Sequence, residues 1–226
     1  MLAELAAELR ALPTAPRQTS TPPAPSPGQE LPLSAAQQRL WFLWKLDPAS
    51  AAYHVSGALE LGGALDEAAL HAAYAALVAR HPGLRLRFGE RGGVPYQRID
   101  EAGGALRLID LQDAPERLDD RLRALVREPF DLLAAPPLRG VLVRVQARRH
   151  VLLLAMHHLV ADDWSVGLLC RDFAALYRAC AQGGALPPPA LDDAAYAGLL
   201  RARATGPDAA AEDLRSAGIE VQSVAA

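Results

Sequence analysis

Two neighbouring histidines followed by an aspartate are the residues whose types and spacing could do chemistry. His157 and His158 end an apolar run that begins at Val151, and Asp162 follows after three further residues. Because neighbouring residues of a strand point to opposite faces, the two imidazoles should face different surfaces. An imidazole titrates near neutral pH and can accept and return a proton. The pattern predicts a base at the end of a strand, with a carboxylate in the adjoining loop.

Other interpretations of these residues stay open at this point. The histidine pair could be structural, with both rings hydrogen-bonded at a strand end. A zinc site is disfavoured because the sequence has no second cluster of Cys or His to complete a set of three or four ligands, so no metal is expected. Ser165 is expected to cap a helix rather than to act as a nucleophile, since its partner base would have to lie behind the strand end.

The apolar run before the histidines predicts how they are positioned. Residues 151–156 are apolar at every position, which is typical of a central strand covered on both faces. A second strand over residues 138–146 should pair with it across a turn at 147–150. A helix should begin at Ser165, after the loop that holds Asp162. The histidines should therefore lie at the end of a central strand and close to the start of a helix.

Apolar periodicity and turn residues predict the remaining elements. Ser34 and Asp66 should cap helices, and Asp113 with Glu116 resembles a capping box before another. Arg85 and Arg87 should share one face of a strand. The expected helices cover residues 35–45, 67–80, 118–126 and 193–203, and the expected strands cover 55–61, 84–88, 94–96 and 106–110. Hairpins and crossovers occur together, which predicts an α/β sandwich with a mixed sheet and flanking helices.

Length and composition indicate one folded unit with tails. Residues 1–30 should form a short helix and a proline-rich linker, residues 31–205 a single lobe, and residues 206–226 a weakly structured tail. The net charge of −3 gives no basic signature for nucleic acid. No apolar run approaches the ~18 residues that a membrane span needs, and the N-terminus lacks a secretory signal. A cytoplasmic protein is expected.

Three motifs follow one another in the order found in the condensation domains of nonribosomal peptide synthetases, and the chain resembles that family. Residues 34–43 (SAAQQRLWFL) are similar to its Ser-x-Ala-Gln-x-Arg-Leu-Trp-x-Leu opening. Residues 80–88 (RHPGLRLRF) are similar to Arg-His-Glu-x-Leu-Arg-Thr-x-Phe. Residues 156–165 (MHHLVADDWS) are similar to Met-His-His-x-x-x-Asp-Gly-x-Ser. The resemblance implies a chloramphenicol acetyltransferase-like fold.

The resemblance also implies roles for individual residues. His158 would be the catalytic histidine, acting in amide-bond formation between thioesters that carrier proteins present on phosphopantetheine arms. His157 would support the loop. Asp162 would be structural and paired with an arginine of the second motif, either Arg80 or Arg85. The chain itself would bind no cofactor. Its partners would be peptidyl or acyl carrier proteins, and a second condensation lobe or other synthetase domains.

Departures from the family pattern keep three functions open. The resemblance places His158 in a tunnel between two lobes. The glycine after the motif's aspartate is Asp163 here, which should narrow that tunnel. The family's domain also has two lobes, and only the N-terminal lobe is matched. The chain could be part of an amide-forming enzyme, an inactive lobe that docks carrier proteins or serves as a scaffold, or an acyltransferase that uses CoA thioesters with a separate second lobe.

Overall fold

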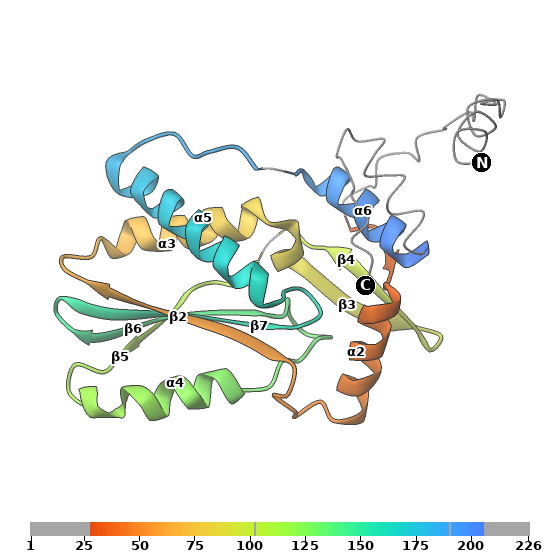
Figure 1. Ribbon diagram of the computed structural model, residues 1–226, viewed down its shortest axis with the longest axis horizontal. Coiled ribbons are helices and arrows are strands. Elements are labelled where there is room, and N and C mark those ends of the chain that lie inside the picture. Colours follow the sequence, from red (N-terminus) through yellow and green to blue (C-terminus); the bar gives the residue numbers. More distant parts are fainter. Residues whose placement is uncertain (1–27, 102, 190, 206–226) are drawn as a thin grey trace, which may run out of the picture.

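A four-stranded sheet forms the centre of the part of the chain that the structure, a computed structural model, describes: residues 28–101, 103–189 and 191–205 (Figure 1). The order of its strands is β2 (His54–Gly62), β7 (Arg149–His157), β6 (Leu138–Gln146) and β5 (Arg107–Asp110). The first three are antiparallel neighbours, and β5 runs parallel to β6. The sheet is therefore mixed, as the sequence predicts.

Helices cover both faces of this sheet. The helices α3 (Glu67–Arg80) and α5 (Asp163–Gln182) lie on one face, and α4 (Leu118–Arg127) lies on the other (Figure 1). Side chains of β7 alternate between the two cores: Leu152 and Leu154 pack in the α3 and α5 core, whereas Val151 and Leu153 pack in the α4 core. The prediction of a central strand that is buried on both faces is confirmed.

A three-stranded sheet lies beside the central one. It consists of β1 (Leu31–Pro32), β4 (Val94–Ile99) and β3 (Leu86–Arg91), in that order. The helices α2 (Ala35–Leu46) and α6 (Asp193–Thr205) pack against it through a core that includes Trp41, Trp44 and Phe88. Ser34 caps α2 as predicted, and its side chain accepts a hydrogen bond from the backbone N–H of Gln37.

Two local predictions are wrong, and proline accounts for both. Residues Pro82–Arg85 form the 3-10 turn η1, so β3 begins only at Leu86, and Arg85 is buried instead of sharing a strand face with Arg87. Pro115 opens a second 3-10 turn, η2 (Pro115–Arg117), and α4 then starts without a side-chain cap. Proline has a fixed φ and no N–H, which suits the first position of a helical turn.

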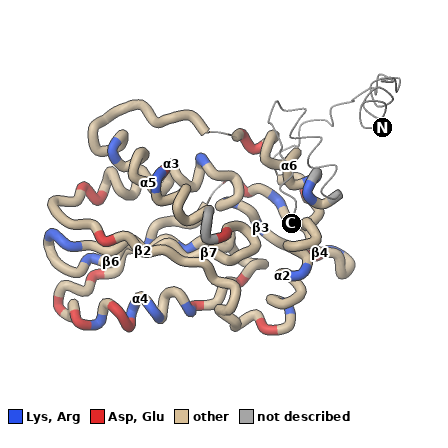
Figure 2. Tube along the Cα trace, in the orientation of Figure 1, with Lys and Arg blue, Asp and Glu red and all other residues tan. Residues whose placement is uncertain are grey.

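The helix, linker and tail predicted before residue 28 and after residue 205 lie outside the described residues. None of the helices in the described part could cross a lipid bilayer. In α4, Asp119 and Asp120 come before Arg121, Arg123 and Arg127, and acidic and basic residues are interspersed along the trace in Figure 2.

Candidate active site

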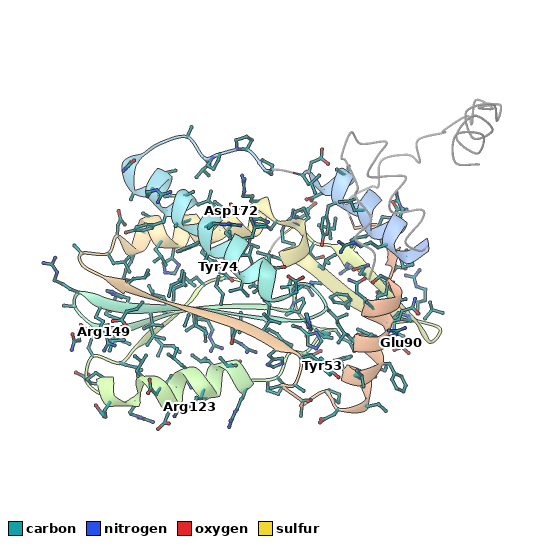
Figure 3. All side chains as sticks on the ribbon, viewed as in Figure 1. Tyr53, Tyr74, Glu90, Arg123, Arg149 and Asp172 are labelled. Atoms are coloured by element: carbon teal, nitrogen blue, oxygen red, sulfur yellow. The ribbon has the colours of Figure 1, made fainter. Side chains whose placement is uncertain are left out.

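His158 follows the last residue of β7 and presents an exposed imidazole. Its backbone N–H donates to the carbonyl of Tyr53 at 2.8 Å, which ties it to the start of β2, where Figure 3 labels Tyr53. Its Nδ1 lies 2.7 Å from the carbonyl oxygen of Ala161. A carbonyl can only accept, so Nδ1 carries the proton, and in the neutral ring Nε2 keeps a free lone pair. In the neutral ring, Nε2 is therefore the nitrogen that can accept a hydrogen bond.

His157 points the other way and is 2% exposed. Its Nδ1 accepts a hydrogen bond from the backbone N–H of Leu159 at 3.2 Å, so the proton of the neutral ring lies on Nε2. Burial, with smaller contributions from the nearby imidazoles of His54 and His158, lowers the pKa of His157 to about 4. The prediction that the two rings face different surfaces is confirmed, and His157 is neutral at pH 7.

Asp162 is the N-cap of α5. Its Oδ1 accepts hydrogen bonds from the backbone N–H of Ser165 at 2.8 Å and from the Ser165 hydroxyl at 2.5 Å, and the backbone N–H of Asp162 donates to the same hydroxyl. The bonds from Ser165 lower the pKa of the Asp162 carboxyl. Ser165 thus belongs to the cap, as expected of a non-nucleophilic serine, but α5 begins at Asp163 rather than at Ser165.

The predicted pairing of Asp162 with Arg80 or Arg85 is wrong. The Nε of Arg80 donates to Asp172 of α5 at 2.9 Å (Asp172 is labelled in Figure 3). Arg85 places two guanidinium nitrogens on the two carboxylate oxygens of Asp193, at 3.1 and 2.5 Å. Arg80 meets Asp172 because α3 runs along α5, and Arg85 meets Asp193 because α6 starts beside η1. Asp162 instead caps the N-terminus of α5.

A pocket of about 260 Å³ lies beside this loop. Its walls are mainly apolar and come from four segments: the second motif, the loop after His158, α5 and α6. The lining includes Gly83, Leu84, Val160, Ala161, Leu169 and Tyr196. His81 is also in the wall, and its Nε2 lies 2.8 Å from the Oδ2 of Asp172. Neither His81 nor Tyr196 is predicted as a site residue from the sequence, although His81 lies inside the second motif.

The three motifs contact one another in the fold: Gln37 of the first donates from its Nε2 to the Leu159 carbonyl of the third, and residues of the second and third line the same pocket. The model of the condensation domain matches residues 28–208. The chain belongs to the condensation-domain family. CymA of Salinispora arenicola, a probable nonribosomal peptide synthetase, is 44% identical over 164 residues, which are 72% of this chain and 2% of that protein.

Solved condensation domains share the fold as well. The first condensation domain of the calcium-dependent antibiotic synthetase, solved in complex with a substrate analogue, is 31% identical, with a TM-score of 0.66 over 76% of this chain and 43% of that one. The X-domain solved in complex with OxyB from teicoplanin biosynthesis is 36% identical, with a TM-score of 0.68 over 77% and 38%. The expected fold class is confirmed. The chain spans about two fifths of these solved chains and a few per cent of its curated relatives.

Asp163 stands where the condensation motif has glycine. Its backbone forms the first residue of α5, directly after the capping residue Asp162. The position of its side chain is outside the description, so crowding of His158 by Asp163 stays a prediction. The arrangement places the exposed imidazole of His158 just before the N-terminus of α5, and the mainly apolar pocket lies beside the same loop without His158 in its lining.

Proposed function

We propose that this chain supplies the histidine-bearing lobe of an amide-forming condensation domain. The observation that carries the proposal is the exposed His158, whose Nδ1–H is bound by the Ala161 carbonyl and whose Nε2 has no hydrogen-bond partner among the described side chains. Membership of the condensation-domain family and the match of all three motifs support it. The substrates would be an acyl thioester and an amine, each presented by a carrier protein on a phosphopantetheine arm.

The chemistry follows from the free nitrogen. The acceptor amine attacks the carbonyl carbon of the donor thioester, a C–N bond forms, and the C–S bond breaks to release a thiolate. Nε2 of His158 holds the amine in place and takes the proton that the nitrogen loses, which can then pass to the thiolate. His157 is neutral at pH 7, and its buried ring does not reach the surface on which His158 is exposed. Its role is to support the loop. Asp162 keeps the loop attached to α5.

The test is amide formation between two loaded carrier proteins, followed by mass spectrometry, with this lobe inside its complete domain or with a second lobe added in trans. His158→Ala should abolish turnover while binding of the carrier proteins is retained. His71→Ala is the matched control, because His71 is an exposed histidine on α3. Equal turnover of His158→Ala and the parent would refute the proposal.

A docking or scaffold lobe without catalysis is the second candidate. Two observations favour it: Asp163 replaces the motif's glycine, and a relative that is 36% identical was solved bound to another protein. Carrier binding without turnover in the parent would establish this alternative. In an active domain, Asp163→Gly should raise turnover if the carboxylate crowds His158, and an unchanged or lower rate would show that it is accommodated.

A further inference from the structure

Gln37, in the first motif, has a side-chain amide that the mechanism above does not use. It is the third residue of α2, where a capping box needs an acceptor for the backbone N–H of Ser34, and its Oε1 lies 3.0 Å from that nitrogen. Glutamate and glutamine both serve this cap, because either side chain offers the oxygen. Only glutamine also has an NH₂ group, which can donate to other parts of the chain.

Both hydrogens of this NH₂ group have acceptors outside α2. Nε2 of Gln37 donates to the backbone carbonyl of Leu159 at 3.3 Å and to Oε1 of Gln97 at 2.9 Å. The amide of Gln97, which is fully buried in β4, donates back to Oε1 of Gln37 at 3.1 Å and to the carbonyl of Pro32 at 2.9 Å. The two side-chain amides thus form a closed pair in which every N–H has an acceptor.

Backbone groups fix the direction of each amide in the pair. The Ser34 N–H can only donate, and the Leu159 and Pro32 carbonyls can only accept. Turning Gln37 over would set its oxygen against the Leu159 carbonyl and its NH₂ group against the Ser34 N–H. Turning Gln97 over would set its oxygen against the Pro32 carbonyl. Polar groups left without partners in a buried place are costly, so the pair has one satisfied arrangement, and it presents an N–H to Leu159.

Leu159 is the residue after His158, and hydrogen bonds hold both of its backbone groups. Its N–H donates to Nδ1 of His157 at 3.2 Å, and its carbonyl accepts from Gln37. Two residues further along, the carbonyl of Ala161 accepts Nδ1–H of His158 at 2.7 Å. The Gln37 amide therefore ties α2 to the short loop that orients the imidazole of His158.

We propose that Gln37, oriented by Gln97, is a positioning residue for His158. The N–H that Gln37 gives to the Leu159 carbonyl fixes the loop, and the loop fixes the Ala161 carbonyl that binds Nδ1 of His158. Gln37 acts through this loop and not on the substrates. The inference rests on the proposed function only for the role of His158 in turnover.

Amide hydrogen exchange of the ¹⁵N-labelled full chain reads the loop directly. The reporters are the N–H of Leu159 and the N–H of Val160, which donates to the carbonyl of His157. Gln37→Glu keeps the oxygen that caps Ser34 and loses both donors. Exchange at the two reporters should become about fivefold faster, which corresponds to the loss of one net hydrogen bond.

Gln38 provides the matched control. It is the next residue of α2, and its Nε2 donates to the Leu33 carbonyl instead of the loop, so Gln38→Glu should leave both reporters unchanged. Gln37→Met removes the amide without adding a charge, should speed exchange at the reporters as well, and decides the question if Gln37→Glu does not fold.

A double-mutant cycle tests whether Gln97 acts through Gln37. Gln97→Met removes the group that orients Gln37 and should also speed exchange at Val160. The double variant Gln37→Met/Gln97→Met should be no faster there than Gln37→Met alone, since without Gln37 the second amide has no route to the loop. Effects that multiply in the double variant would overturn the pair as a unit.

The tautomer of His158 is a readout that a merely structural role would not move. Long-range ¹⁵N–¹H correlation spectra at pH 7.5 should show His158 of the parent protonated at Nδ1, and this form should fall in Gln37→Met. Val143→Ala, in the core beneath α4, should lower the melting temperature and leave the tautomer unchanged. An unchanged tautomer, or unchanged exchange at Leu159 and Val160, in a folded Gln37→Met variant would overturn the proposal.

These spectra need no substrate and no second lobe. In a complete, active domain, Gln37→Met should lower kcat and leave KM for the carrier proteins unchanged. Absence of amide formation by the parent would refute the proposed function and leave the exchange and tautomer tests standing. Unchanged exchange in Gln37→Met, together with loss of turnover in His158→Ala, would remove the role of Gln37 and keep the proposed function.

Discussion

Acid should weaken the fold through His157, because its ring is buried and neutral. The pKa of an unfolded histidine is about 6.5, and burial lowers that of His157 to about 4 in the folded chain. Between these values the unfolded chain binds a proton that the folded chain does not. The free energy of unfolding must therefore fall as the pH drops from 6.5 to 4. Above pH 6.5 the stabilisation from the neutral His157 ring is fully present.

The size of the effect follows from the shift. A difference of 2.5 pKa units at ~1.36 kcal/mol each gives about 3 kcal/mol when the window has been crossed, and about 2 kcal/mol by pH 5. His157 is 2% exposed, so solvent screens this term little. Protonation also puts a second hydrogen on the ring at Nδ1, where the Leu159 N–H now donates. The loop that carries His158 should loosen with the same titration.

The assay is urea unfolding at several pH values between 7 and 4.5, for the parent and for His157→Asn. The asparagine oxygen can accept the Leu159 N–H and does not titrate in this range, so the variant should lose less stability on acidification by about 2 kcal/mol at pH 5. His81 also has a pKa lowered by burial, but it is present in both proteins and cancels in the difference. Parallel pH profiles of the two proteins would refute the reasoning.

Two further predictions concern packing and capping. Gly140→Ala should cost about 1–3 kcal/mol of unfolding free energy in urea, since the new Cβ would lie 2.4 Å from the Tyr74 ring, whereas Gly167→Ala, with open space around its Cβ, should cost nothing. Asp162→Ala should cost about 1 kcal/mol through loss of the α5 cap, and Asp162→Asn should retain most of it. Equal unfolding free energies in urea of the two glycine variants, or of the two Asp162 variants, would contradict these predictions.

The sequence predicts much of the site because local rules govern it. Alternation along β7 places His157 and His158 on different surfaces, and the apolar run predicts burial of the strand on both faces. The helix that follows the loop is predicted from its periodicity. These features depend on neighbours in the chain, so they can be read without knowing how the chain packs.

The predictions from local sequence patterns are wrong at two prolines. Apolar alternation suggested a strand from Leu84, but Pro82 begins a 3-10 turn, and the strand starts two residues later at Leu86. The pair Asp113 and Glu116 had the spacing of a capping box, yet Pro115 lies between them and starts a turn of its own. In both places a fixed φ outweighs the side-chain pattern.

Tertiary structure alone decided the partners of the charged and imidazole groups. Arg80 and Arg85 could each have met Asp162, and only the packing of α3 on α5 and of α6 beside η1 gives them Asp172 and Asp193 instead. The register of β2 with β7 likewise sets His54 against His157. Motifs in the sequence determined the family and the histidine pair. Contacts between distant segments, which local periodicity does not encode, decided what holds His158 in place.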